Sequence, residues 1–235
     1  MTDQQMTEQT ISKPNRALMN AASLLIFMLI YLALGVVCLW QWGEPRGWSR
    51  IDFFTGIALA LSVLMGAEHL AFSRSIAEEI KSEAFGTSYD PGMAGFVTTL
   101  GILEIVVFLD YGHWHLAPAL ENEVLQSAGL GLYIITLLWL RWTDTALIRH
   151  FNDARGVITK GPFRHIRHPR YGALIASRIA FALAFASLPG WALAAGWVMA
   201  VHRRIVREEP HLKEIFGPEY EAYASKTARL IPGIY

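Results

Sequence analysis

The chain has 235 residues, and its 20 Lys and Arg are balanced by 20 Asp and Glu. Hydrophobic residues make up 53% of it and charged residues only 17%, whereas soluble domains carry about 25% charged residues. This composition favours an all-α, multi-pass integral membrane protein among membrane lipids, and we expect no nucleic-acid partner.

Four apolar segments are predicted to span the membrane after a polar N-terminal tail at residues 1–16. A helix crosses a bilayer core of about 30 Å with roughly 17–25 apolar residues. The segments are residues 17–43, 53–72, 92–109 and 124–140, and the fourth is predicted to continue as an amphipathic helix to about His150. Residues 74–91 are predicted to form a polar loop or surface helix, and residues 111–123 a short loop.

A fifth apolar run, residues 171–202, is predicted to fold as a re-entrant helical hairpin. As one helix it would be about 48 Å long, which is too long for a single untilted span. Pro189-Gly190 lies near its middle, and this pair favours a turn that leaves two short helices. Residues 203–216 and 218–228 are then predicted as short cytoplasmic helices separated by Gly217, and Pro210 is a place where the first can kink.

The distribution of basic residues supports the hairpin. If the run crossed the membrane once, the Lys and Arg that follow His202 would lie outside. A hairpin instead keeps nearly all 20 Lys and Arg on the cytoplasmic side, as the positive-inside tendency requires. The hairpin also brings the loop at 161–171 to the same face as the segment after His202.

Three charged residues fall in or near apolar segments: Glu68, Glu104 and Arg178. Charges in a membrane usually face the protein interior, where they pair with one another or line a polar pocket. The single cysteine, Cys38, cannot form an internal disulfide and is predicted to be a packing or lipid-facing residue. The histidines lack partners at metal-ligand spacing, so no metal site is predicted.

The two polar blocks that flank the hairpin hold the candidate chemical groups. Arg204 and Glu208 are four residues apart and share a helix face, with Glu209 beside them. This spacing suits either a surface ion pair or two groups that face a cavity. His168 and Tyr171 lie where a helix N-terminus attracts anions, although the arginines around them also suit a membrane-orienting flank or contacts with lipid phosphates.

Together these blocks resemble the isoprenylcysteine carboxyl methyltransferase family and its phospholipid-methyltransferase relatives. The matching positions are Gly161-Pro162-Phe163, Arg167-His168-Pro169, Tyr171, Arg204, Glu208-Glu209, Leu212, Phe216-Gly217, Tyr220, Tyr223, Arg229 and Pro232. The resemblance covers roughly residues 141–235, which would form the methyltransferase core. The first 120 residues carry no such signature, and residues 17–140 would form the N-terminal transmembrane helices on the substrate side.

The resemblance implies a membrane enzyme that uses S-adenosyl-L-methionine. It implies catalytic roles for Arg204, which would face the acceptor, and for Glu208. The cofactor contacts it implies are Arg155, Gly156, Val157, Ile158, Phe163, His168, Pro169, Arg170, Tyr171, Glu208 and Glu209. Phe163 stands where the family usually has tyrosine. The acceptor would be lipidic or a small hydrophobic molecule: an isoprenylcysteine-type carboxylate, a phospholipid amine or a thiol.

A different class of protein remains open from the sequence. A non-catalytic membrane subunit that carries haem or a quinone would use histidines such as His69, His113 or His202. The sequence does not favour an oligomeric state.

Overall fold

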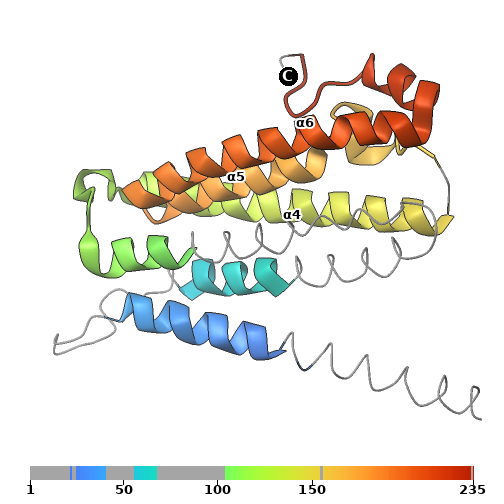
Figure 1. Cartoon of the computed structure of the whole chain (residues 1–235). Helices are drawn as coiled ribbons and strands as arrows, with labels where there is room; N and C mark the ends of the chain where they lie inside the picture. Colours follow the sequence, from blue (N-terminus) through green and yellow to red (C-terminus); the bar gives the residue numbers. More distant parts are fainter. Residues whose placement is uncertain (1–21, 23–24, 41–55, 68–103, 154–155, 234) are drawn as a thin grey trace, which may run out of the picture.

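The computed structural model describes residues 22, 25–40, 56–67, 104–153, 156–233 and 235 (Figure 1). Within these residues the chain is helical, and no β-strand is present. The predictions for residues 1–16 and 74–91, and for Glu68, His69 and Arg155, lie outside the described residues.

Two apolar helices come first, Leu25–Leu39 and Gly56–Ala67. Leu25, Ile26 and Leu29 are each 56% exposed, which suits a helix surrounded by lipid. A further helical segment, residues 104–109, runs directly into the π-helical turn η1 (Asp110–Trp114). The loop predicted from residue 111 is therefore wrong at its start, and the 3₁₀ turn η2 (Pro118–Leu120) follows.

Helix α4 (Glu123–Asp153) confirms the prediction that the fourth apolar segment continues past residue 140 to His150. In the described part of the chain it is the one helix long and apolar enough to cross a membrane, over Glu123–His150. The described parts of the first two predicted spans are shorter, so the structure confirms an all-helical fold with one clear candidate span.

Helices α5 (Pro169–Ala184) and α6 (Leu188–Ala224) form the predicted hairpin and pack against each other (Figure 1). The turn, however, lies at residues 185–187 and not at Pro189-Gly190. Ser187 caps α6 by accepting a hydrogen bond from the Gly190 amide at 3.1 Å, and Pro189 sits in the first turn of that helix. Proline is favoured at this position because no helical amide bond is lost there, so Ser187-Leu188-Pro189 was the better signal of a helix start.

The segment after His202 is not separate from the hairpin, as predicted, but continues α6 without interruption. Nothing between residues 203 and 216 breaks a helix, and the backbone keeps helical dihedral angles through Pro210. The predicted break at Gly217 is confirmed, because this residue has φ 52° and ψ −131°. The short helix after Gly217 ends at Ala224, four residues earlier than expected.

Aromatic side chains fill the space between the helices. Phe181 of α5 and Phe185 in the turn after it pack edge-on against Phe108, with ring centroids 5.5 and 5.3 Å apart, and the ring of Tyr133 on α4 packs against Phe181. Helices α4 and α5 approach closely at Gly129, where a Cβ atom would lie 2.5 Å from the Ala184 nitrogen. The buried core thus runs through α4, α5 and α6 and includes residues of the two N-terminal helices, such as Tyr31 and Leu59.

An ion pair is buried in this core, so of the two arrangements expected for charges in the apolar segments, Arg178 and Glu104 adopt the paired one. The Arg178 guanidinium on α5 donates to the Glu104 carboxylate, and the side chains are 1% and 6% exposed. A buried pair contributes little net stability, but a single unpaired charge at this depth is costly. The pair therefore fixes how α5 meets the segment that contains residues 104–109.

We predict that Arg178→Met lowers the free energy of unfolding by about 3–5 kcal/mol, because it leaves Glu104 buried without its partner. The double variant Arg178→Met/Glu104→Gln should recover part of this loss, since no charge is then buried. Thermal unfolding in detergent measures both. A double variant as unstable as the sum of its two single variants would contradict this account.

Candidate active site

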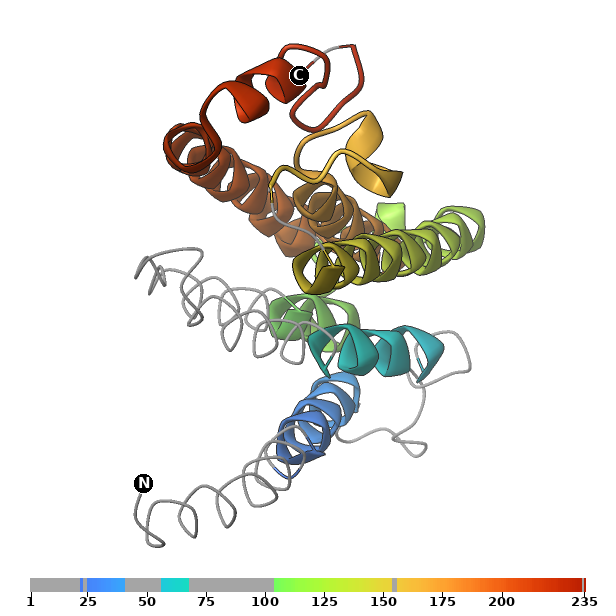
Figure 2. The same cartoon turned by 90° about the vertical axis from the view of Figure 1, so that its right-hand side faces the viewer.

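The loop before α5 is held against the C-terminal tail (residues 225–235). It begins with the 3₁₀ turn η3 (Gly161–Arg164), and His168 is the N-cap of α5, with Pro169 in the first helical turn as predicted. The Arg167 amide donates to the Ala228 carbonyl at 2.7 Å and the His168 amide to the Arg229 carbonyl at 3.0 Å. Both views show this loop and the tail side by side at one end of the bundle (Figures 1 and 2).

Tyr171 joins the two predicted catalytic residues on α6. Its hydroxyl donates to Glu208 Oε2 at 2.8 Å and accepts a hydrogen bond from Arg204 Nε. Arg204 Nε and Glu208 Oε2 are 3.9 Å apart, and the Glu208 side chain remains 37% exposed. The pair is therefore not a simple surface ion pair, since a tyrosine from the histidine loop lies between its members.

Burial and the neighbouring Glu208 carboxylate raise the pKa of Tyr171 above its ordinary value, with Arg204 acting in the opposite direction. The phenol thus stays protonated and donates to Glu208 throughout the physiological range. The His168 ring packs beside the Tyr171 ring, with centroids 5.7 Å apart.

Glu209 is buried and bound by three cationic or polar side chains from two other segments. Its Oε1 accepts from Arg167 Nε at 2.9 Å and lies 3.4 Å from His168 Nε2. Its Oε2 accepts from Arg229 Nε at 2.9 Å and lies 2.8 Å from Arg229 Nη2. Both oxygens therefore bind side chains of the protein, and the cofactor contact that the resemblance implied for Glu209 stays a prediction.

These contacts set the charge of Glu209. Burial opposes ionisation, but hydrogen bonds from His168, Arg229 and Arg167 outweigh it and hold the pKa of Glu209 well below its ordinary value of 4.5. The hydrogen bond between Glu209 and Arg229 also raises the pKa of Arg229. The carboxylate is thus ionised at neutral pH and fastens the loop and the tail to α6.

Other predicted contact residues also have partners within the protein. Arg170 Nε donates to the buried Asp144 of α4 at 2.8 Å, so this arginine joins α4 to α5. The Gly156 carbonyl is 2.9 Å from His150 Nε2, and the Val157 amide donates to Glu219 at 3.0 Å. Gly156, Val157 and Ile158 are only half-buried and remain accessible in part.

Two tyrosines of the final helical turns belong to the same region. Tyr223 donates to the carbonyl of the buried Phe163 at 2.7 Å and thereby holds η3. The hydroxyl of Tyr220 is buried and has no hydrogen-bond partner among the described residues. Burial and the nearby Glu209 raise the pKa of Tyr220 to about 12. Tyr220 is not among the predicted site residues, although it is three positions from Tyr223 and therefore shares a helix face with it.

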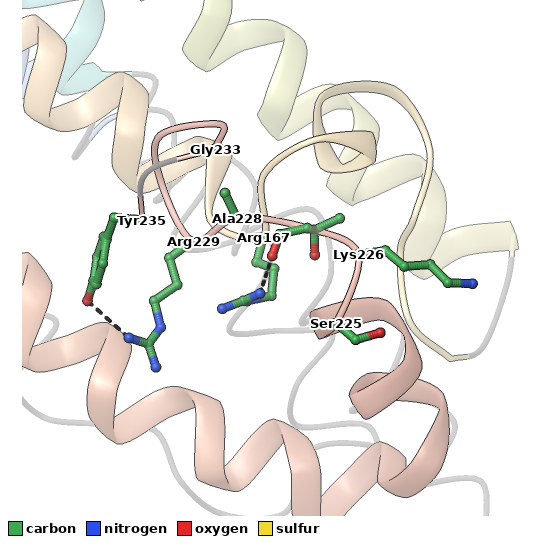
Figure 3. A pocket seen from close by; sticks show the side chains of 8 residues that line it. Arg167, Ser225, Lys226, Ala228, Arg229, Gly233 and Tyr235 are labelled. Atoms are coloured by element: carbon green, nitrogen blue, oxygen red, sulfur yellow. Dashed lines mark hydrogen bonds between the residues drawn. The ribbon is translucent and has the colours of Figure 1, made fainter.

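An open hollow of about 450 Å³ lies between the loop and the tail (Figure 3). Its lining residues are Arg167, Ser225, Lys226, Thr227, Ala228, Arg229, Gly233 and Tyr235. None of the predicted cofactor contacts lines it. Figure 3 shows the Lys226 side chain extending away from the two arginines, whose guanidinium groups bind Glu209.

Comparison with known proteins gives one match. Residues 124–219 match the protein family described as phospholipid methyltransferase, a span that contains α4, the histidine loop, α5 and most of α6. No curated protein and no solved structure matches the chain.

We predict that Glu209→Gln lowers the free energy of unfolding by about 2–3 kcal/mol, because Arg167 and Arg229 lose a buried counter-charge. Since the folded-state pKa of Glu209 is lowered, its contribution is present above its ordinary pKa and is lost as pH falls below it. Thermal unfolding of both proteins between pH 4 and pH 8 measures this. A stability difference that grows as pH falls would contradict it.

Proposed function

We propose that the protein, whose residues 124–219 match the phospholipid methyltransferase family, methylates a lipidic or small hydrophobic acceptor with S-adenosyl-L-methionine. The observation that carries the proposal is the meeting of His168 and Tyr171 with Arg204 and Glu208 at one end of the α5–α6 hairpin.

The side chains present suit this cofactor. S-adenosyl-L-methionine would supply an electrophilic methyl group on a positively charged sulfonium, along with an ammonium and a carboxylate. The partly exposed Glu208 offers an anion for a cationic group. The buried Tyr220 hydroxyl lacks a partner among the described residues, and such a group usually binds something. The half-buried segment 156–158 would complete the cofactor contacts.

Methyl transfer of this kind requires mainly position and electrostatics from the enzyme. A carboxylate acceptor would be held by Arg204, which Tyr171 and Glu208 already orient. An amine or thiol acceptor would have to lose a proton, and Glu208 is the carboxylate placed to receive it, because Glu209 is held by three partners. Glu208 is therefore the proposed base and Arg204 the proposed acceptor ligand.

We further propose that the chain crosses the membrane several times and that the site lies at its cytoplasmic surface. The exposed leucines and isoleucines of Leu25–Leu39 and α4 support a lipid-facing bundle. The loop and the tail contain most of the basic residues near the site, and such segments stay on the cytoplasmic side. A soluble cofactor would then enter from water and a lipidic acceptor from the bilayer.

We expect Glu208→Gln and His168→Ala to weaken S-adenosylhomocysteine binding at least about 100-fold, the loss of a charge-assisted contact, while the protein stays folded in detergent. Titration calorimetry measures the affinity. Glu214→Gln is the matched control, because Glu214 lies on the same helix with its side chain 83% exposed. Unchanged affinity in both site variants would remove these residues from the cofactor site.

The acceptor class is tested separately. Radiolabelled S-adenosyl-L-methionine offered with an isoprenylcysteine, a phosphatidylethanolamine or a lipophilic thiol should label one of these three classes. A purified protein that binds no S-adenosylhomocysteine and instead contains haem or a quinone would overturn the proposal in favour of a carrier subunit.

A further inference from the structure

We infer that Arg229 of the C-terminal tail is a positioning residue for the cofactor site, acting through Glu209 on the orientation of His168. The inference rests on the proposed function, because it assigns the regulation of cofactor affinity to a residue outside the predicted contacts. Three structural observations carry it.

The first is the division of the Glu209 carboxylate between two segments. Arg229 approaches Oε2 through both Nε, at 2.9 Å, and Nη2, at 2.8 Å. The loop uses only the other oxygen, since Arg167 Nε lies 2.9 Å and His168 Nε2 lies 3.4 Å from Oε1. With Oε2 held by Arg229, the carboxylate cannot rotate, and Oε1 stays directed at the loop.

The second observation is the contact between Glu209 Oε1 and the ring of His168. The ionised carboxylate lies 3.4 Å from Nε2, so it holds this edge of the ring toward Glu209. The ring is buried and packs beside the Tyr171 ring, whose hydroxyl donates to Glu208. The orientation of His168 is thus connected to the proposed catalytic carboxylate.

The third observation is that the backbone of Arg229 binds the loop, whereas its side chain binds Glu209. Its carbonyl accepts from the His168 amide at 3.0 Å, which holds the tail to the loop. A side-chain substitution leaves this backbone hydrogen bond in place. The side chain can therefore be tested without detaching the tail.

The test measures S-adenosylhomocysteine affinity by titration calorimetry for Arg229→Gln, Arg229→Lys and the control Arg207→Gln, whose side chain is exposed on α6. We expect Arg229→Gln to bind about tenfold more weakly, the effect of breaking one contact in a coupled network. Arg229→Lys should restore part of the affinity, and Arg207→Gln should match the unmodified protein.

A double-mutant cycle separates positioning from a general loss of stability. If Arg229 acts through Glu209, then Arg229→Gln should cost almost nothing further in a Glu209→Gln background. The same loss of affinity in both backgrounds would overturn the inference. Equal affinity of Arg229→Gln and the unmodified protein would overturn it as well.

The pH dependence gives a second readout. The groups that interact with Glu209 are Arg167 and His168 from the loop, Arg229 from the tail, and Tyr220 from the end of α6. Removing Arg229 removes one of the hydrogen bonds that lower the pKa of Glu209, so the carboxylate should protonate at a higher pH. As the pH is lowered, S-adenosylhomocysteine affinity should therefore begin to fall at a higher pH in Arg229→Gln than in the unmodified protein. Loss of affinity at the same pH in both proteins would contradict this.

The proposed function and the positioning role fail in different ways. If the unmodified protein does not bind S-adenosylhomocysteine, the proposed function is wrong and the positioning role falls with it. If the unmodified protein binds and Arg229→Gln binds equally well at every pH, only the positioning role is wrong.

Discussion

The buried carboxylate of Glu209 is the constraint on which the polar end of this molecule depends. A lone ionised carboxylate at this depth would be unstable, so it requires its partners on both sides: Arg167 and His168 from the loop, and Arg229 from the tail. Three segments far apart in the sequence are thereby held at one point. The neighbouring Glu208 is left partly exposed, with Tyr171 and Arg204 as its partners. Of these two adjacent glutamates on α6, Glu209 therefore holds segments of the protein together, and Glu208 is the one accessible to a ligand.

The apolar part of the chain makes this arrangement possible. The short turn at residues 185–187 reverses the chain, and the aromatic packing of Phe181 and Phe185 fixes α5 against the core. Because α6 continues unbroken from Ser187 to Gly217, the rigid helix that is capped at the turn also carries Arg204, Glu208 and Glu209 to the far end of the hairpin. The packing of the apolar helices and the geometry of the site are therefore connected through a single helix. The Arg178–Glu104 pair extends this connection toward the N-terminal helices.

Much of the fold could be predicted from the sequence because it follows from strong local signals. Apolar length predicted α4, the charge distribution predicted the hairpin, and Gly217 marked a helix end. The predicted position of the hairpin turn is wrong because proline can either end a helix or begin one. Here Ser187 caps α6, and Pro189 lies in the first turn of that helix. At the site, spacing placed Arg204 and Glu208 on one face, but it could not show Tyr171 between them. It could not show that Glu209 binds the loop and the tail, or that Asp144 is the partner of Arg170, because these contacts join residues 20 or more positions apart.

The central claim is that Glu209 fastens the histidine loop and the tail to the same end of the hairpin. A spin-label distance between Arg164→Cys and Lys226→Cys in a Cys38→Ala background tests it most directly. His165 and Ala228 are joined by a backbone hydrogen bond of 3.3 Å, so the labelled Cα atoms should lie within about 20 Å. We predict a narrow distribution of short distances that broadens when Glu209→Gln is added. A distance of about 30 Å or more, the thickness of a bilayer core, would place the two segments on opposite sides of the membrane and contradict the account.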